Sequence, residues 1–365
     1  MKIALVHDYL KEFGGAERVL SVLSEMYPDA PIYTAFYDKN SEAYRRFKNK
    51  KIVASWFGKM PFAARLASPL RFLTPYIWGG FHFSAYDVVI SSASWYITKG
   101  FGTRGTNKKN PVEICYCHTP PRWLYGYKTS VNLQKYALVR GYAKVVGFLL
   151  RKYDYARAQK VNIFLANSQE VQKRIKKFYK RDAVVVYPPV FLPKIGEVKK
   201  EDYYFIVSRL VGAKGLEMAV EAAEKAGFTL KIAGSATGYF HADHLKNSAN
   251  VTFLGHVSDE ALVKLYAGAK AFLALARDED FGITPVEAQL CGTPVIAFNG
   301  GGYKETVIDG KTGILFDEYS VDGLMNAVKK FEKTPIAADA CKKQAKKFSK
   351  EAFIAKIQSI VATVK

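Results

Sequence analysis

The sequence lacks the features that define several classes of protein. Its 365 residues include four cysteines, with no CxxC pair and no spacing typical of a disulfide framework, so we expect free thiols and a reducing compartment. No signal-peptide pattern precedes the strand-like residues that follow Met1. The longest apolar-rich stretch, 61–83, is interrupted by two arginines and three prolines, which argues against a transmembrane helix there. We therefore expect a cytoplasmic protein.

Acidic residues are scarce in the first half of the chain. Residues 1–190 hold 31 basic and 12 acidic side chains, a net charge of +19, whereas residues 191–365 hold 23 and 21, a net charge of +2. This asymmetry favours an anionic partner for the first half, either a nucleic acid or a membrane surface, over a merely solvated basic face. Between Glu42 and Asp87, basic residues alternate with aromatic residues and no acidic residue occurs. Either the rings insert among anionic lipid headgroups, or they fill the domain core while the charges face water.

Short apolar runs alternate with helical periods along most of the chain. Strand-like stretches such as Ile3–His7 are followed by helix-like stretches such as Glu17–Met26, and this alternation is typical of parallel sheets. It stops at Pro188 and Pro189, before a lysine-rich stretch, and then begins again. We predict Rossmann-like domains at 1–192 and 193–347, and a terminal helix within 348–365 that packs back on the first domain.

Two loops that follow predicted strands carry groups suited to phosphate. Gly14 and Gly15 precede a helix, where backbone amides and the helix dipole favour an anion, although a simple turn also explains a glycine pair. Arg209 and Lys214 lie beside another helix start, and two cations suit a diphosphate. A solvated basic loop is the alternative at that position.

A third loop, 277–288, contains paired carboxylates. Glu279 lies in the loop, and Glu287 lies eight residues later on a helix that we expect Thr284 to cap and Pro285 to open. Carboxylates accept hydrogen bonds from pairs of hydroxyls, so one could bind a sugar and the other a ribose, while the amides near Phe281 meet phosphate. Ordinary charge placement near a helix start is the alternative.

This arrangement, with Gly292-Thr-Pro-Val-Ile-Ala after it, resembles the retaining GT-B glycosyltransferases of family four, the glycosyl transferases group 1. The E-x7-E signature of that family matches Glu279 to Glu287 without a gap. The other matching segments, in order, are Gly14-Gly15-Ala-Glu17, Cys117-His118-Thr-Pro-Pro-Arg122, and Ser208-Arg209 with Lys214-Gly215-Leu-Glu217. The resemblance covers nearly the whole chain and implies an α/β GT-B fold, with two Rossmann-like domains facing across a cleft.

The resemblance also implies a role for each matching residue. Arg209 and Lys214 would neutralise the donor diphosphate, and His118 would close on the donor sugar from the first domain. Glu279 would bind the transferred sugar and Glu287 the ribose. The other implied donor contacts are Gly14, Gly15, His256, Val257, Phe281, Gly282, Ile283 and Thr284, with His256 and Val257 near the base. Cationic side chains and a helix dipole can stabilise the leaving diphosphate, so we expect no metal and no cofactor beyond the nucleotide-sugar donor.

The stretch 117–125 is most similar to mannosyltransferases of bacterial surface-polysaccharide assembly, which implies GDP-mannose as the donor. A UDP-hexose would leave most motifs unchanged, and Asp280, where many relatives have a small residue, puts the sugar specificity in doubt. The acceptor implied is a lipid-linked saccharide or a polysaccharide. With the basic first half, this predicts peripheral association with the inner face of the cell membrane. Both a same-face mechanism and a covalent Glu279 intermediate are compatible with retention.

Three other functions are compatible with parts of the sequence. A nucleic-acid-binding protein would explain the charge, but no zinc-finger, RNP-like, KH-like or helix-turn-helix pattern occurs, and the paired glutamates would have no role. A nucleotide-sugar epimerase or a phosphorylase could share the fold, because a fold does not fix its chemistry. A non-catalytic sugar-binding scaffold would bind the donor without turnover. We expect a transferase and no nucleic-acid partner.

Overall fold

The computed structural model describes the chain except for residues 103–110, 128–136, 194, 209–213, 235–246 and 365. It forms two compact units, each with its own parallel sheet. The first unit holds the described parts of 1–189 together with the end of the chain from Glu351, and the second holds the described parts of 190–350. The chain thus passes between the units at 189/190 and 350/351, three residues from each of the predicted boundaries at 192/193 and 347/348.

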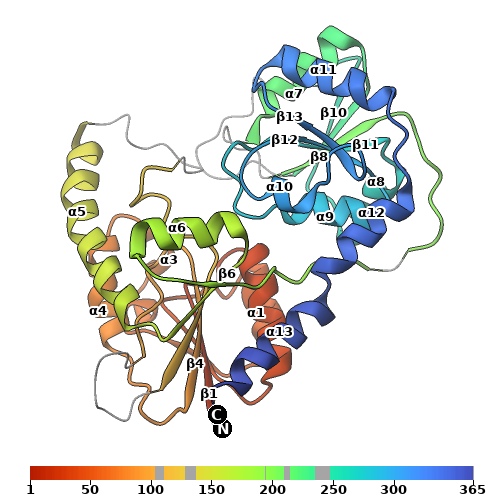
Figure 1. Ribbon diagram of the computed structural model, residues 1–365. Helices are drawn as coiled ribbons and strands as arrows, with labels where there is room; N and C mark the ends of the chain where they lie inside the picture. Colours follow the sequence, from red (N-terminus) through yellow and green to blue (C-terminus); the bar gives the residue numbers. More distant parts are fainter. Residues whose placement is uncertain (103–110, 128–136, 194, 209–213, 235–246, 365) are drawn as a thin grey trace. The chain divides into compact units, whose positions relative to one another are not determined.

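The first unit is built on a seven-stranded sheet in the order β3-β2-β1-β4-β5-β6-β7, with every pairing parallel (Figure 1). Its strands are β1 (Ile3–His7), β2 (Ile32–Thr34), β3 (Ile52–Ala54), β4 (Val88–Ala93), β5 (Val112–Cys117), β6 (Ile163–Ala166) and β7 (Val184–Val185). Its helices are α1 (Gly15–Met26), α2 (Glu42–Phe47), α3 (Ala63–Leu66), α4 (Thr74–Gly79), α5 (Ala137–Lys160), α6 (Gln169–Tyr179) and α13 (Lys350–Ala362), with short 3-10 turns at Phe57–Lys59 and Arg71–Leu73.

Helix α13 completes the core of this first unit. Phe353, Ile357 and Val361 recur every four residues, so they lie on one face of the helix, and all three are buried in the same cluster as the inward side chains of β1, β4 and α1. The ring of Phe353 packs edge-on against Tyr116 of β5, with 5.8 Å between centroids. The end of the chain is therefore part of the hydrophobic core that the beginning of the chain forms.

The aromatic residues between 42 and 87 divide between core and surface. Phe47, Phe57 and Trp78 are fully buried, as the core interpretation predicts. Trp56, Met60, Phe62, Phe72 and Tyr76 are instead exposed, and Phe62 and Tyr76 are each about 70% exposed. Helix α5 adds further exposed apolar side chains, namely Tyr142, Val145, Phe148, Leu149 and Tyr155.

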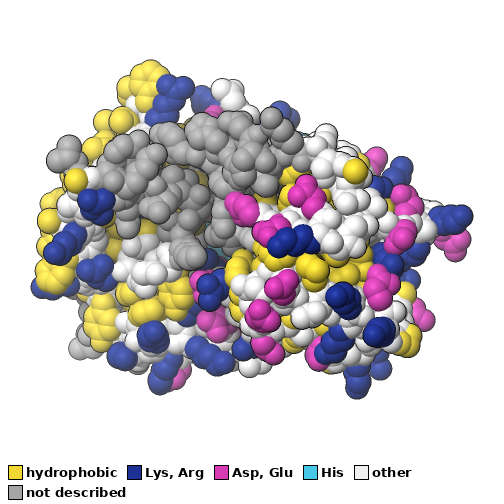
Figure 2. Space-filling view, turned by 90° about the horizontal axis from the view of Figure 1, so that it is seen from above, with side chains coloured by type: hydrophobic (Ala, Val, Ile, Leu, Met, Phe, Trp, Pro, Cys, Tyr) yellow, Lys and Arg dark blue, Asp and Glu magenta, His cyan; other side chains and the backbone are white. Residues whose placement is uncertain are grey.

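The exposed side chains of α5 make up the outer surface of this helix, which Tyr142 joins to the 61–80 segment, because its hydroxyl donates a hydrogen bond of 2.5 Å to the Pro69 carbonyl. We call this surface the α5 face. Its apolar members lie beside exposed Arg140, Lys144, Arg151 and Lys152, and Figure 2 shows hydrophobic side chains adjoining Lys and Arg on the side of the first unit where α5 lies. No acidic side chain is exposed on α5, since Asp154 is fully buried.

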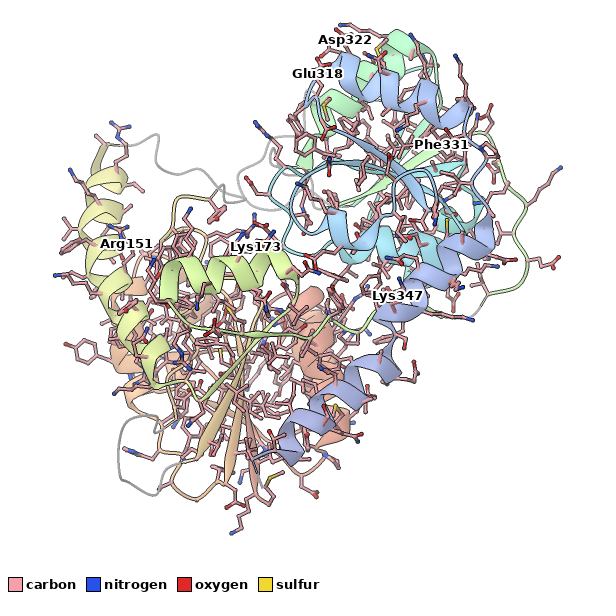
Figure 3. The ribbon with its side chains drawn as sticks, viewed as in Figure 1. Arg151, Lys173, Glu318, Asp322, Phe331 and Lys347 are labelled. Atoms are coloured by element: carbon pink, nitrogen blue, oxygen red, sulfur yellow. The ribbon has the colours of Figure 1, made fainter. Side chains whose placement is uncertain are left out.

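The second unit contains a six-stranded parallel sheet in the order β10-β9-β8-β11-β12-β13. Its strands are β8 (Tyr204–Val207), β9 (Leu230–Ala233), β10 (Val251–Gly255), β11 (Ala271–Ala274), β12 (Val295–Phe298) and β13 (Gly313–Phe316). Its helices are α7 (Leu216–Ala226), α8 (Asp259–Gly268), α9 (Ile283–Leu290), α10 (Tyr303–Thr306), α11 (Val321–Glu332) and α12 (Ala338–Ala345), with a 3-10 turn at Lys346–Phe348. Helices α7 and α11 pack on one side of the sheet, where Phe331 joins the core (Figure 3), and α8 and α9 contribute to the core on the other side.

Both sheets confirm the predicted Rossmann-like folds. In each, the strand order reverses beside the first strand, so β1 lies between β2 and β4, and β8 lies between β9 and β11. Open parallel sheets bind ligands beyond the carboxyl ends of their strands at such a reversal. The positions to examine are therefore the ends of β1, β4 and β5 in the first unit and of β8 and β11 in the second.

Within the described residues, no helix combines the length and the apolar character needed to cross a membrane. The four cysteines are free thiols; Cys115, Cys117 and Cys341 are buried, and Cys291 is half-buried.

Candidate functional site

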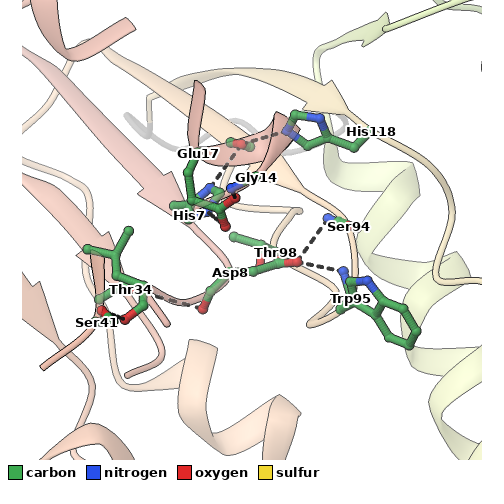
Figure 4. A network of polar contacts seen from close by, with 12 residues as sticks. His7, Asp8, Gly14, Glu17, Thr34, Ser41, Ser94, Trp95, Thr98 and His118 are labelled. Atoms are coloured by element: carbon green, nitrogen blue, oxygen red, sulfur yellow. Dashed lines mark hydrogen bonds and ion pairs between the residues drawn. The ribbon is translucent and has the colours of Figure 1, made fainter. Parts of the chain in front are cut away.

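The carboxyl ends of β1, β4 and β5 are joined by a chain of hydrogen bonds, which we call the histidine relay (Figure 4). His7, the last residue of β1, pairs with Ser92 of β4 in the sheet register. The His7 Nδ1 lies 3.0 Å from the Ser92 Oγ, and the His7 Nε2 lies 3.2 Å from the Glu17 Oε1. The same Ser92 Oγ lies 2.9 Å from the Nε2 of His118, which follows β5 directly. The relay therefore runs Glu17–His7–Ser92–His118.

Glu17 also occupies the start of helix α1. Its Oε2 accepts a hydrogen bond of 2.8 Å from the amide of Gly14, the residue that caps the helix, and Gly15 begins the helix. Burial raises the pKa of the Glu17 carboxyl, but the hydrogen bond and charge of His7 and the Gly14 amide outweigh it, so the pKa lies below the ordinary value. The amide that was predicted to meet a donor phosphate is thus bonded to a carboxylate of the same chain.

His118 is held in a fixed orientation by the residues around it. Its amide donates to the Ala93 carbonyl, its carbonyl accepts from the Asn167 side chain at 2.9 Å, and its ring packs on Tyr116. Burial, and next the charge of His7, lower the pKa of His118 to about 3, so the imidazole is neutral at physiological pH. Its Nδ1 has no partner among the residues that the structure describes. A neutral imidazole with one ring nitrogen unpaired can donate to or accept from a hydroxyl group.

Asp8 fixes the loop that follows β4. Its carboxylate accepts hydrogen bonds from the amides of Ser94 and Trp95 and from the hydroxyl of Thr98. Burial raises the pKa of Asp8, and these bonds and the charge of His7 oppose that shift. Asp8 and the relay members His7 and Ser92 were not predicted. The signal was present, because a histidine and an aspartate end an apolar strand, and Ser91-Ser92 interrupts another.

In the second unit, Lys214 and Glu279 form an ion pair. The Lys214 Nζ lies 2.7 Å from the Glu279 Oε2, with the two side chains 30% and 20% exposed. The Tyr303 hydroxyl lies 3.5 Å from the same oxygen, and the Gly302 amide donates to the Glu279 carbonyl at 2.9 Å. The residues that the sequence assigned to the diphosphate and to the sugar are therefore in direct contact.

Gly215 allows the loops after β8 and β11 to approach each other. It precedes α7 in the left-handed conformation, with φ +71, and a Cβ there would lie 2.9 Å from the Leu275 Cβ and from the Tyr319 hydroxyl. A side chain at this position would force apart the two loops that carry Lys214 and Glu279. Arg209, assigned to the diphosphate with Lys214, lies outside the described residues.

Helix α9 begins without a capping side chain. The prediction that Thr284 caps it is wrong, because the helix begins at Ile283 and its cap is Gly282, at φ +89. A Cβ on Gly282 would lie 2.7 Å from the ring of Tyr303, and Phe281 before it is buried against Phe348. Thr284 lies within the first turn instead. The first amides of α9 therefore have no side-chain acceptor from the cap residue, which is an arrangement that favours an anionic ligand.

The remaining predicted residues occupy different environments. Glu287 lies on α9 and is 2% exposed, and its Oε2 accepts a hydrogen bond of 2.7 Å from the Tyr266 hydroxyl. His256 is exposed after β10, and Val257 is half-buried against the core. Across the described parts of the chain, no three or more His, Cys, Asp or Glu side chains are grouped to hold a metal ion.

Comparison with known proteins identifies the second unit. Residues 189–348 match the family described as Glycosyl transferases group 1. By this similarity, we call the matched segment the group 1 domain. Lys214, Glu279 and Glu287 all lie within the group 1 domain.

Two curated relatives and one solved structure illustrate the similarity. The chain is 38% identical over 130 residues to a glycogen synthase of Thermus thermophilus, covering 33% of this chain and 30% of that protein. It is 34% identical over 155 residues to a D-inositol 3-phosphate glycosyltransferase of Mycobacterium avium, covering 40% and 37%. The chain thus spans about a third of the length of each relative.

The solved structure of Anabaena Alr3699/HepE in complex with UDP and glucose matches 99% of both chains, with a TM-score of 0.69 and 19% identity. At this identity the likeness shows the fold alone. With the two parallel sheets and the group 1 domain, it confirms the predicted GT-B fold class.

Proposed function

We propose that this protein is a retaining glycosyltransferase that moves a hexose from a nucleotide-sugar to an acceptor hydroxyl without a metal ion. The observation that carries the proposal is the Lys214–Glu279 pair within the group 1 domain. An ammonium group neutralises a diphosphate, and a carboxylate accepts hydrogen bonds from sugar hydroxyls. Each partner therefore occupies the other until a donor brings a phosphate for Lys214 and hydroxyls for Glu279.

Helix α9 supports the same assignment. Its start is uncapped by a side chain, and the positive end of its dipole would stabilise the diphosphate that leaves during transfer. On the family resemblance we also assign Arg209 to the diphosphate, Glu287 to the ribose and His118 to the sugar. Lys214, Arg209 and the α9 dipole supply the positive charge that a divalent cation supplies in other transferases, which is the basis for proposing a metal-independent reaction.

In the same-face mechanism, the glycosidic C–O bond breaks and its electron pair remains on the diphosphate. The acceptor oxygen then bonds to the face that the diphosphate leaves, and its proton passes to the diphosphate. In the alternative, the Glu279 carboxylate displaces the diphosphate from the sugar carbon and forms a covalent bond there. The acceptor oxygen then displaces the carboxylate, and the proton of the acceptor passes to the diphosphate. Glu279→Gln distinguishes the two, since an amide still accepts hydrogen bonds but is no nucleophile: residual transfer favours the same-face route.

For the donor, we propose GDP-mannose, on the similarity of residues 117–125 to mannosyltransferases of surface-polysaccharide assembly. A UDP-hexose is the second candidate, favoured by the likeness to the Anabaena protein in complex with UDP and glucose. The relatives named as a glycogen synthase and an inositol phosphate glycosyltransferase extend the range of sugars and acceptors to be tested.

Thermal shift measurements without metal test the donor proposal. GDP, UDP, GDP-mannose and UDP-glucose are compared with the wild type, with Lys214→Ala, and with Lys225→Ala as a matched control. Lys225 also pairs with a glutamate at 2.7 Å, but as an exposed residue on α7. A ligand that binds only the folded protein raises its melting temperature. We expect a shift with GDP ligands that is lost in Lys214→Ala and kept in Lys225→Ala, and no shift with any nucleotide would contradict a transferase.

We further propose that the first unit associates peripherally with an anionic membrane, at the inner face of the cell membrane, where a lipid-linked saccharide would be the acceptor. The α5 face supports this, because exposed Tyr142, Val145, Phe148 and Leu149 lie among arginine and lysine side chains without an exposed acidic residue on the helix. Coulomb attraction would hold the face at the surface, and the apolar groups would enter the headgroup layer.

Vesicle sedimentation tests this association. Vesicles that contain phosphatidylglycerol should sediment the wild type at low salt, and pure phosphatidylcholine vesicles should not. The double variant Phe148→Ser/Leu149→Ser should remain in solution, whereas the control Ile308→Ser, an exposed apolar residue of the second unit, should sediment like the wild type. Equal sedimentation with both lipids, or an unaffected double variant, would refute the α5 face as the binding surface.

A further inference from the structure

The histidine relay has a direction that its hydrogen atoms determine. The Glu17 carboxylate has a lowered pKa and only accepts hydrogen bonds, and it lies 3.2 Å from the His7 Nε2. The His7 Nε2 therefore carries a proton whether His7 is neutral or charged. What can vary is whether the His7 Nδ1 carries a proton. It carries none in the neutral ring, which we call bare, and one in the cation.

Ser92 couples the proton on the His7 Nδ1 to the tautomer of His118, because its hydroxyl has a single hydrogen and can donate to only one of the two rings at a time. When the His7 Nδ1 is bare, Ser92 donates to it, and the Ser92 oxygen accepts from the His118 Nε2–H. The His118 Nδ1 is then bare. When the His7 Nδ1 carries a proton, it donates to Ser92, Ser92 donates to the His118 Nε2, and the remaining proton of neutral His118 moves to Nδ1.

We propose that Ser92 transmits the protonation state of His7 to His118, so that the Nδ1 of His118 accepts a hydrogen bond when His7 is neutral and donates one when His7 is charged. Ser92 and His7 are thus positioning residues that act through His118. For sugar transfer, the consequence rests on the proposed function: a bare Nδ1 accepts from a sugar hydroxyl, and Nδ1–H donates to its oxygen.

The groups around His7 fit this role. Among the described residues, the ionisable side chains that interact with it include Glu17 on α1, Asp8 next to it in the chain and His118 after β5, while β4 and β2 place the uncharged Ser92 and Thr34 beside it. His118 stays neutral because its pKa is lowered to about 3. The Glu17 Oε1, 3.2 Å from the His7 Nε2, can pair with the His7 ring when that ring is charged.

Histidine nitrogen NMR on the full chain tests the proposal without any donor or acceptor. Long-range ¹H–¹⁵N spectra separate the Nδ1–H and Nε2–H forms of each ring, and His118→Gln and His7→Gln assign the signals. As the pH is raised, we expect His118 to change from the Nδ1–H to the Nε2–H form at the same pH at which His7 loses its Nδ1 proton. In Ser92→Ala, His7 should titrate while His118 no longer follows it, and the control Ser94→Ala, whose hydroxyl is outside the relay, should behave like the wild type.

A second variant keeps the test decisive if Ser92→Ala does not fold. Glu17→Gln removes the carboxylate that stabilises charged His7, so both transitions should move to lower pH together. The proposal is overturned if His118 keeps one form while His7 titrates, if His7 keeps one form throughout, or if the two midpoints separate in Glu17→Gln. A separate sugar-transfer assay distinguishes the relay from the proposed function. A protein that shows the coupled change but transfers no sugar supports the relay and contradicts the transferase. A protein that transfers sugar without the coupled change contradicts the relay.

Discussion

The Lys214–Glu279 pair predicts different effects of one substitution on two ligands. Glu279→Gln removes the negative charge that competes with a diphosphate for Lys214. A partly exposed pair of this kind contributes about 0.5–1 kcal/mol, so release of Lys214 should strengthen binding of a bare nucleoside diphosphate roughly two- to fivefold. For the sugar donor, the glutamine amide still accepts a hydrogen bond, but a neutral bond of about 1 kcal/mol replaces a charge-assisted one of about 1.5–3 kcal/mol. The sugar donor should therefore lose roughly 2- to 30-fold in affinity relative to the bare diphosphate.

Isothermal titration calorimetry with GDP, GDP-mannose, UDP and UDP-glucose measures both effects at one salt concentration, because salt screens the exposed part of the pair. Glu221→Gln is the matched control, since Glu221 forms a 2.7 Å pair with Lys225 on α7, and neither affinity should change. If Glu279→Gln weakens the bare diphosphate and the sugar donor equally, Glu279 does not contact the sugar, and the assignment of the pair to the donor site is wrong.

Three further predictions concern stability and pH. Gly282→Ala should destabilise the second unit by about 1–3 kcal/mol, because the added Cβ would lie 2.7 Å from the Tyr303 ring. The control Gly227→Ala, at a left-handed position with open space around it, should cost only about 1 kcal/mol, and thermal unfolding compares the two variants. The pKa of His118 is lowered from 6.5 to about 3, so the free energy of unfolding of the first unit should fall by up to about 1.4 kcal/mol per pH unit as the pH falls below 6.5. Denaturant titrations of His118→Gln should lack this dependence on pH. The pKa of Glu17 is lowered, so its carboxylate should stabilise the fold above pH 4.5 and lose that contribution at lower pH. If the loss of stability at low pH is the same in Glu17→Gln as in the wild type, this prediction is wrong.

The sequence was sufficient for the two sheets because their order follows from local patterns. Ile3–His7 is an apolar run that a parallel sheet buries on both faces, and this strand has the predicted bounds. The contact between Lys214 and Glu279 was also foreseeable, since both belong to loops that follow strands of one sheet.

The relay was not foreseeable, because it depends on the register that pairs His7 with Ser92, 85 residues later in the chain. The predicted cap at Thr284 failed because the left-handed Gly282 begins the helix earlier than the side-chain pattern indicates. The aromatic residues of 42–87 divided between core and surface because their exposure depends on which of them α3, α4 and the neighbouring strands cover. No periodicity within that segment contains this information.

The place of α13 in the first core has a consequence for synthesis at the ribosome. Phe353, Ile357 and Val361 emerge after the described part of the second unit has been made, so the first unit remains without part of its core until these residues emerge. The described part of the second unit, 190–350, is a single stretch of the chain and can fold as it emerges. At about 5–20 residues per second, the earlier half waits on the order of ten seconds or longer with an apolar face uncovered. A nascent chain stalled before residue 350 should therefore need a chaperone for its first unit but not for its second.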